Sequence, residues 1–332
     1  LVFFLVIGAY VTFYLFDGTS DIYQQISSVE NFKKLTHIQG MEGGFNWFLT
    51  MGLSFFAIFL LPRQFQVSVV ENSREKHLKK AIWLFPLYLI LFNVFVIFIA
   101  WGGKITFGDT VNADYFTLLL PLKEGNTFLA TLVFLGGFSA VISMVVVSTL
   151  ALSTMVSNNL VIPYGFLSKF SEGESEKNSK YIKNIRRISI FLIIIAAYLF
   201  YVNFSIELSL ISIGLISFVI ISQLAPSFFI GLYWNRASSK ATIIGILVGF
   251  IVTAYTLILP FTLEAFTGYA SFTHDGPFGI ALLKPYELFG IDFLSPPAHA
   301  FFWSLLLNTF CYLTFSLLQK GNYRERNYAE MF

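Results

Sequence analysis

The sequence predicts an all-α membrane protein with eight transmembrane helices. Two observations lead to this prediction: the composition is strongly apolar, and its few charges are missing from eight long stretches. Of the 332 residues, 56% are hydrophobic and 12% are charged, whereas a soluble domain carries roughly 25% charge. The 40 Phe residues equal all Lys, Arg, Asp and Glu residues together. This composition excludes disordered, collagen-like and disulfide-scaffold chains.

Each predicted span is a stretch without Asp, Glu, Lys or Arg. A bilayer core about 30 Å thick needs about 20 apolar residues per helix. One charge at mid-membrane costs about 2.5–3.5 kcal/mol, while each Leu, Ile, Phe or Val favours insertion by about 0.3–0.6 kcal/mol. The predicted spans are Leu1–Phe16, Phe45–Leu61, Ile82–Trp101, Phe128–Val156, Ile188–Val202, Ile211–Trp234, Thr242–Leu259 and His299–Leu318. Their continuous apolarity differs from the alternating pattern of an outer-membrane strand.

The distribution of Lys and Arg between the spans predicts the orientation. Alternate segments, from 62 to 81, 157 to 187, 235 to 241 and from 319 onward, hold 16 of the 21 Lys and Arg residues. Because cytoplasmic loops carry the excess of basic residues, we expect these segments and both ends of the chain in the cytoplasm. The expected location is a bacterial inner (plasma) membrane, with the lipid bilayer as a partner.

Residues for catalysis or for metal binding are not grouped in this sequence. The four His residues have no Cys, His or carboxylate neighbour at the spacing of metal ligands. No phosphate-binding glycine loop occurs, and no nucleophile elbow. We therefore expect no enzyme activity within this chain. A net charge of +2 gives no basic face for nucleic acid, and the one cysteine, Cys311, excludes an internal disulfide.

Hydroxyl groups are concentrated on the fourth predicted span. At 100° per residue, most of its Ser and Thr residues share about one third of the helix circumference with Gly136; Ser148 points the other way. In one interpretation Ser139 and Ser143 line a path for an ion or a solute. In the other, the stripe serves close helix packing, and the hydroxyls bond to carbonyls four residues earlier.

Two prolines predict interruptions in the second and sixth spans. Pro62 would end or break its helix and free backbone carbonyls, either as a simple helix end or as part of a site. Pro226 follows Gln223 inside an apolar run. A buried amide and a proline within lipid both need partners, so Gln223 is expected either in the solute path or as a hydrogen-bonding strut between helices.

Several segments together resemble the sodium/solute symporter family, and most closely its branch fused to sensor histidine kinases. The segments that carry the resemblance are 61–72 (LPRQFQVSVVEN), 83–89 (WLFPLYL), 136–140 (GGFSA), 151–163 (ALSTMVSNNLVIP), 223–227 (QLAPS), 231–237 (GLYWNRA) and 303–308 (WSLLLN). The chain also begins inside an apolar run without a signal-peptide pattern, so we expect it to be part of a longer protein.

The resemblance implies a LeuT-type inverted-repeat bundle, of which this chain would hold the C-terminal two thirds. The first predicted span would be the last helix of the first repeat, and spans two to six would form the second repeat. Residues 1–318 would be a transporter-like domain truncated at its N-terminus. Residues 319–332 would begin a cytoplasmic linker to a signalling domain.

The resemblance also implies site residues. A partial sodium site would comprise Ala140 and Ser143, and Met144 stands where the family has a second hydroxyl, although a thioether is not a hard oxygen ligand. Ser54 and Ile58 match positions that contact the solute. Together with Ser139 and Gln223 they form the predicted solute path. No cofactor is implied apart from a sodium ion.

The functional hypothesis is a membrane domain that binds or moves a small organic solute, such as an amino or carboxylic acid, coupled to sodium. It would be the input domain of a transporter-linked sensor histidine kinase, with a fused or partner kinase module. The alternatives are a stand-alone sodium/solute symporter and a solute receptor that signals without transport.

Overall fold

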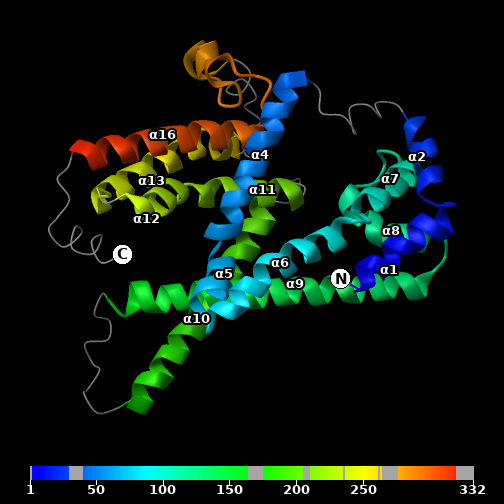
Figure 1. Cartoon of the computed structure of the whole chain (residues 1–332), viewed down its shortest axis with the longest axis horizontal. Helices are drawn as coiled ribbons and strands as arrows, with labels where there is room; N and C mark the ends of the chain where they lie inside the picture. Colours follow the sequence, from blue (N-terminus) through cyan, green and yellow to red (C-terminus); the bar gives the residue numbers. More distant parts are fainter. Residues whose placement is uncertain are drawn as a thin grey trace. The chain divides into compact units, whose positions relative to one another are not determined.

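The computed structural model describes residues 2–29, 40–163, 175–204, 210–234, 236–260, 262–263 and 276–318. Within these ranges the regular secondary structure is entirely helical (Figure 1). The predicted linker, residues 319–332, lies outside the described residues, as do residues 164–174 of the basic segment from 157 to 187.

Seven helical stretches among the described residues are long and apolar enough to cross a membrane. They are Gly40–Leu60, Glu75–Phe107, Thr127–Val161, Lys180–Asn203, Leu210–Tyr233, Ser239–Ile258 and Pro296–Leu318. An eighth span results if Val2–Leu15 and Thr19–Ser27, which are bent by 73° at their junction, form one broken span. The prediction of an all-helical integral membrane protein is thereby confirmed, with seven to eight candidate spans.

The chain forms two compact units. The first unit comprises Leu1–His37 and Gln66–Tyr198, and the second comprises Ile38–Phe65 and Leu199–Phe332. Both units are therefore assembled from segments that lie far apart in the sequence.

Among its described residues, the first unit contains four longer helices and several short helical elements. In chain order they are α1 (Val2–Tyr10), η1 (Val11–Leu15), α2 (Thr19–Ser27), η2 (Gln66–Val70), α6 (Glu75–Asn93), α7 (Val96–Phe107), η3 (Ala113–Tyr115), α8 (Phe116–Lys123), α9 (Thr127–Met155), η4 (Val156–Val161) and most of α10 (Ser175–Phe204). Of the short η elements, η3 is a 3₁₀ helix and the others are π-helices.

Glycines let aromatic side chains enter the core of the first unit. A Cβ on Gly8 of α1 would lie 2.2 Å from the Cβ of Phe95, and one on Gly103 of α7 would lie 2.1 Å from the ring of Phe116. Both aromatic residues pack with the buried core around Ile7.

The third predicted span, Ile82–Trp101, is interrupted in the structure. A two-residue turn that includes Phe95 separates α6 from α7.

The second unit contains the remaining elements. They are α4 (Gly40–Leu60), α5 (Pro62–Phe65), α11 (Leu210–Ser222), η5 (Pro226–Ile230), α12 (Gly231–Tyr233), α13 (Ser239–Thr253), η6 (Ala254–Ile258), η7 (Pro277–Gly279), η8 (Ala281–Leu283), η9 (Leu288–Gly290) and α16 (Pro296–Leu318). Here η5 and η6 are π-helices, and η7 to η9 are 3₁₀ turns.

Helices α13 and α16 lie side by side (Figure 1). Each buries a row of residues spaced four apart: Ala241, Gly245, Gly249 and Thr253 on α13, and Ala300, Ser304, Asn308, Tyr312 and Ser316 on α16. Residues spaced four apart form one ridge of a helix surface. Because small residues let helix backbones approach closely within a membrane, the two ridges form a tight helix pair.

The two prolines interrupt their helices as predicted. Helix α4 ends at Leu60, and α5 begins at Pro62 after a bend at Leu61. Helix α11 ends at Ser222, and η5 begins at Pro226 after a short turn. A proline nitrogen has no hydrogen to donate, so the carbonyl four residues before each proline loses its usual helical partner.

Candidate functional site

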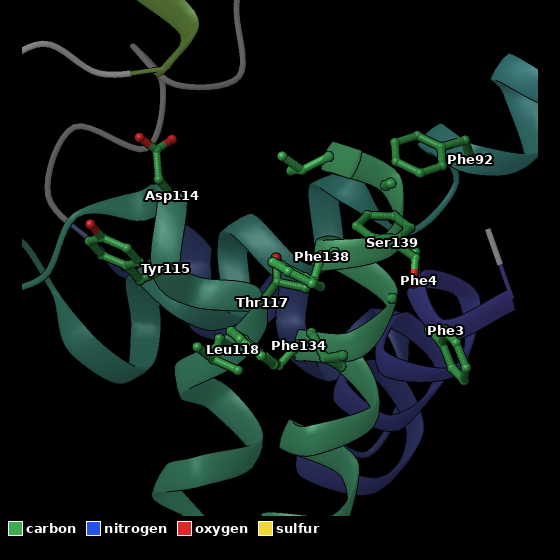
Figure 2. Close-up of a pocket in the computed structure, with 15 residues that line it drawn as sticks. Phe3, Phe4, Phe92, Asp114, Tyr115, Thr117, Leu118, Phe134, Phe138 and Ser139 are labelled. Carbon is green, nitrogen blue, oxygen red and sulfur yellow. The ribbon is translucent and has the colours of Figure 1, made fainter. Parts of the chain in front are cut away.

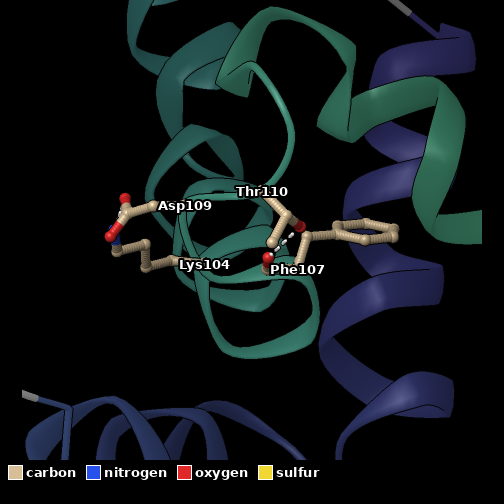
Figure 3. Close-up of polar contacts among 4 residues, drawn as sticks. All are labelled: Lys104, Phe107, Asp109 and Thr110. Carbon is tan, nitrogen blue, oxygen red and sulfur yellow. Dashed lines mark hydrogen bonds and ion pairs between the residues drawn. The ribbon is translucent and has the colours of Figure 1, made fainter.

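A cavity in the first unit begins beside the turn that follows α7. Gly108 ends α7 with a φ of +60°, a left-handed conformation that glycine adopts without strain, and its N–H donates to the Lys104 carbonyl at 2.9 Å. Lys104 pairs with Asp109, and the Thr110 hydroxyl donates to the Phe107 carbonyl at 2.6 Å (Figure 3). These contacts fix the start of the segment that leads to α8.

The same segment positions one carboxylate. The side chain of Asn112 accepts a hydrogen bond from the Asp114 N–H at 3.0 Å, which caps the 3₁₀ turn η3. Lys123, at the end of α8, donates to the Thr106 carbonyl at 3.2 Å and lies 5.4 Å from the Phe107 ring centre. Asp114 thus lies in the capped 3₁₀ turn η3. The segment that contains this turn contacts α7 at its start and, through Lys123, at its end.

The cavity has a volume of about 770 Å³, within the range of roughly 300–1,000 Å³ typical of small-molecule sites. The 15 lining residues come from α1, α6, η3, α8 and α9. They are Phe3, Phe4, Phe92, Asp114, Tyr115, Thr117, Leu118, Val133, Phe134, Gly136, Gly137, Phe138, Ser139, Ala140 and Val141. Most of the wall is aromatic or aliphatic, and a few oxygen atoms interrupt it.

Figure 2 shows Asp114 and Tyr115 at one side of this cavity and Phe3 and Phe92 at the other. Gly136 allows α1 to approach α9, because a Cβ there would lie 2.7 Å from the Phe3 ring. The close approach of these two helices closes one side of the cavity.

Two of the predicted site residues on α9 line this cavity and the third does not. Ser139 and Ala140 are in the wall, whereas Ser143, one turn further along α9, is exposed outside it. The Ser139 hydroxyl donates to the Leu135 carbonyl at 2.8 Å, which is the helix-bonded state expected by the packing interpretation. Its oxygen still has an acceptor lone pair for a ligand.

The hydroxyl stripe on α9 divides into two parts. Ser139 and Ser143 are exposed, whereas Ser153 and Ser157 near the other end of the helix are buried. Ser157 accepts a hydrogen bond from Arg186 of α10 at 3.4 Å. The second part of the stripe therefore packs against a neighbouring helix, and only the first part faces open space within the unit.

A separate polar cluster lies inside the second unit, around Gln223. This side chain is 2% exposed, and its Nε2 donates to the Ser304 hydroxyl at 2.8 Å. Asn308 Nδ2 donates to the backbone carbonyl of Gln223 at 2.7 Å and to its Oε1 at 3.2 Å. The hydrogen bonds between helices that were expected of Gln223 are present, and they join the interruption after α11 to α16.

Gly249 of α13 makes room for this cluster. A Cβ at this position would lie 2.1 Å from Gln223 Oε1 and 3.0 Å from Asn308 Nδ2. The polar cluster is thus enclosed by three helical segments of the second unit. Its geometry is that of a structural joint.

Ser54 and Ile58 lie on α4 of the second unit. The Ser54 hydroxyl is half-buried and donates to the Thr50 carbonyl at 3.0 Å, and 42% of Ile58 is exposed. Near them, Phe229 of η5 stacks against Phe55 and Phe56 at centroid distances of 6.2 and 5.5 Å. Aromatic packing thereby joins the end of α4 to the segment that follows Pro226.

The six predicted site residues divide between the two units. Within the first unit, Ser139 and Ala140 share a cavity. Within the second, Gln223 is buried between helices, while Ser54 and Ile58 lie on α4.

Several of the residues that shape these sites were not predicted. Ser304 and Asn308 belong to the segment 303–308 that carries the resemblance, but neither was predicted as a site residue. A second amide inside an apolar span was an available signal of a buried partner. The period-four row of Ala241, Gly245 and Gly249 was a further available signal. The aromatic wall and Asp114 depend on tertiary packing, so no local pattern could identify them.

No family model, curated protein or solved structure matches the chain. The structure itself establishes an all-helical integral membrane protein with seven to eight candidate spans.

Proposed function

We propose that this chain is the membrane domain of a sodium/solute symporter-type protein, which binds a small organic solute such as an amino or carboxylic acid. The observation that carries this proposal is the cavity of about 770 Å³ whose wall includes Ser139 and Ala140. These residues belong to the segment 136–140 on which the sequence resemblance rests, and their span contains no charged residue.

Two further features support the proposal. Solute carriers with inverted repeats place their sites near interrupted helices, where backbone groups are released from helical bonding. In this chain, helices are interrupted before Pro62 and Pro226. A span free of ionisable side chains also argues against a proton relay or a voltage sensor, because both require charged groups within the membrane.

The proposal extends to the fold, the orientation and the partner module. The fold would be a LeuT-type bundle of inverted repeats, with the two repeats rocking around a central site during alternating access. Both chain ends would face the bacterial cytoplasm, and a kinase module would follow. A parent reading frame that enters a histidine kinase after Phe332 supports this arrangement, and a stop codon within a few dozen residues removes it.

Sodium binding provides the first test at the site. Ala140 and Ser143 would supply part of the sodium coordination, so Ser143→Ala should raise the apparent sodium dissociation constant about tenfold, the effect of losing about 1.4 kcal/mol. Binding is measured with radioactive sodium on purified protein in nanodiscs. Ser148→Ala is the matched control, because Ser148 lies on another side of α9.

Equal sodium affinity in Ser143→Ala and the unsubstituted protein would remove Ser143 from the site. Sodium binding that is lost equally in Ser148→Ala would point to a general effect on α9. No enzyme activity and no cofactor other than sodium belong to this proposal.

A further inference from the structure

We propose that the start of helix α6 binds the phosphate group of an anionic phospholipid at the membrane surface. The observation is a face with three lysines, Lys76, Lys79 and Lys80, which form no ion pair among the described residues and are followed on the same face by an exposed tryptophan. The inference is independent of the proposed function, because it depends only on these charges and on the membrane span that α6 begins.

The three lysines and Trp83 share one face of α6. At 100° per residue, positions 76, 79, 80 and 83 fall within roughly 100° of the helix circumference. All three lysines are exposed, and Trp83 is 81% exposed. Helix α6, all of which the structure describes, buries none of its residues. This face is therefore open to an external ligand.

Two glutamates lie close to the lysines in sequence, but neither is paired with them. Glu75 precedes Lys79 by four residues, the spacing of a helical ion pair, and Glu71 instead accepts a hydrogen bond from Gln66 at 3.2 Å. The ion pairs of the described residues include none of the three lysines. Their charges are therefore not neutralised by ion pairs within the part of the chain that the structure describes.

The position of the lysines on the helix favours an external anion. Positive side chains are disfavoured near a helix N-terminus, where the first backbone N–H groups and the helix dipole already carry partial positive charge. Helix α6 begins at Glu75, so Lys76 lies in its first turn, and the N-cap residue Arg74 makes no side-chain hydrogen bond to these N–H groups. An anion beside this turn therefore interacts favourably with the lysines and with the backbone.

The span that follows indicates that this anion is a lipid headgroup. Glu75–Phe107 is one of the candidate membrane spans, and tryptophan side chains prefer the membrane–water interface. The lysines precede Trp83 by three to seven residues, which is within about 11 Å along the helix axis. They therefore lie at the level of the headgroups. Lysine clusters directly beside a span attract the anionic lipids of the cytoplasmic leaflet, the side on which the segment from 62 to 81 is expected.

Phosphatidylglycerol and phosphatidylcholine with identical acyl chains form the test pair, because only the first carries a net negative charge. Each lipid is titrated onto the purified protein in detergent micelles, and the bound lipid is counted by native mass spectrometry. We expect the dissociation constant of phosphatidylglycerol to be at least about tenfold lower, because each lysine near an anionic headgroup changes this constant about fivefold.

Substitutions locate the binding. Lys79→Gln with Lys80→Gln should weaken phosphatidylglycerol binding roughly 25-fold, since two charges are removed, while Lys79→Arg with Lys80→Arg should retain most of it. The matched control is Lys183→Gln with Arg187→Gln, which removes two exposed charges from α10. Because α10 begins at Ser175, these charges lie beyond the first turn, where the helix dipole acts, and their removal should leave the dissociation constant nearly unchanged. The melting temperature of each variant confirms that it is folded.

Equal binding of the two lipids would overturn the proposal. So would phosphatidylglycerol binding that is unchanged in the folded glutamine variant of α6. An equal loss in the α10 control would also overturn it, because the attraction would then belong to the total positive charge and not to this face. Glycerol phosphate, which lacks acyl chains, is added as a competitor, and displacement of the lipid at equal concentration would assign the site to a free phosphate and refute the lipid as its ligand.

Discussion

Gln223 and Asn308 show how single amides stabilise an interrupted membrane helix. Pro226 cannot donate a hydrogen bond to the Ser222 carbonyl, and the chain turns at Gln223 before the π-helix begins. Asn308 then supplies donors to both the backbone and the side chain of Gln223. In lipid there is no water to replace these donors, so the amide pair compensates for the interrupted backbone bonding.

Replacing Asn308 should therefore reduce stability more than removing a hydroxyl on the same helix. Asn308→Leu leaves the Gln223 carbonyl and Oε1 without their donor, and we expect a loss of about 1–2 kcal/mol, since hydrogen bonds within membranes contribute about 0.6 and up to about 1.7 kcal/mol each. Unfolding in mixed detergent micelles measures this change.

The matched control is Thr309→Val, because the Thr309 hydroxyl bonds only to the Leu305 carbonyl of its own helix at 2.7 Å. The double variant Gln223→Leu with Asn308→Leu completes a thermodynamic cycle. A coupling free energy near zero would contradict the proposed joint.

At the residue scale, side-chain chemistry was easier to predict than location. The amide of Gln223 was expected to join helices because a buried amide needs a partner, and the structure supplies Ser304 and Asn308. Ser139 and Ser143 share one helix face by periodicity alone. That Ser139 lines a cavity and Ser143 does not depends on which neighbouring helices pack nearby, and periodicity carries no such information.

Among the helices, the α13–α16 pair depends most clearly on small residues. Gly249 faces Gln223 and Asn308 at distances that leave no space for a side chain, and Gly245 would place a Cβ 2.6 Å from Asn308 Oδ1. The close packing of these helices and the amide joint therefore rely on the same glycines.

Gly249→Ala should destabilise the second unit by about 1–3 kcal/mol, because overpacking a close interface forces neighbouring atoms to move. Gly214→Ala on α11 is the matched control, since a Cβ there meets nothing within 4 Å. Alanine is a better helix former than glycine by about 0.5–1 kcal/mol, so the control should be neutral or slightly stabilising. Equal melting temperatures for the two variants would contradict the close approach of α13 and α16.

Helix positions could be predicted from hydrophobicity, but helix interruptions only in part. The eight predicted stretches all fall on helices or on the bent pair at the start of the chain. Interruptions at Pro62 and Pro226 were predicted because proline has a local effect. The turn between α6 and α7 has no proline. Phe95 of this turn packs against Gly8 of α1, and such a tertiary contact cannot be predicted from the local sequence.

For the molecule as a whole, the distribution of basic residues predicts which loops face the cytoplasm. In a Cys311→Ser background, Ser73→Cys should react with a membrane-impermeant maleimide only after cells are permeabilised. Asp109→Cys, in the loop after α7, should react in intact cells. Both positions are exposed, so a difference in reactivity reports the side of the membrane, and the reverse pattern would invert the topology.

The most direct measurement for the proposed function is uptake into proteoliposomes. The purified chain is reconstituted, and radiolabelled amino acids and carboxylic acids are supplied with an inward sodium gradient, with the same gradient of potassium as the control. The account predicts accumulation of at least one solute above its external concentration that requires the sodium gradient and is reduced in Ser143→Ala. Solute binding without accumulation in either gradient would contradict sodium-coupled transport and leave a receptor as the function.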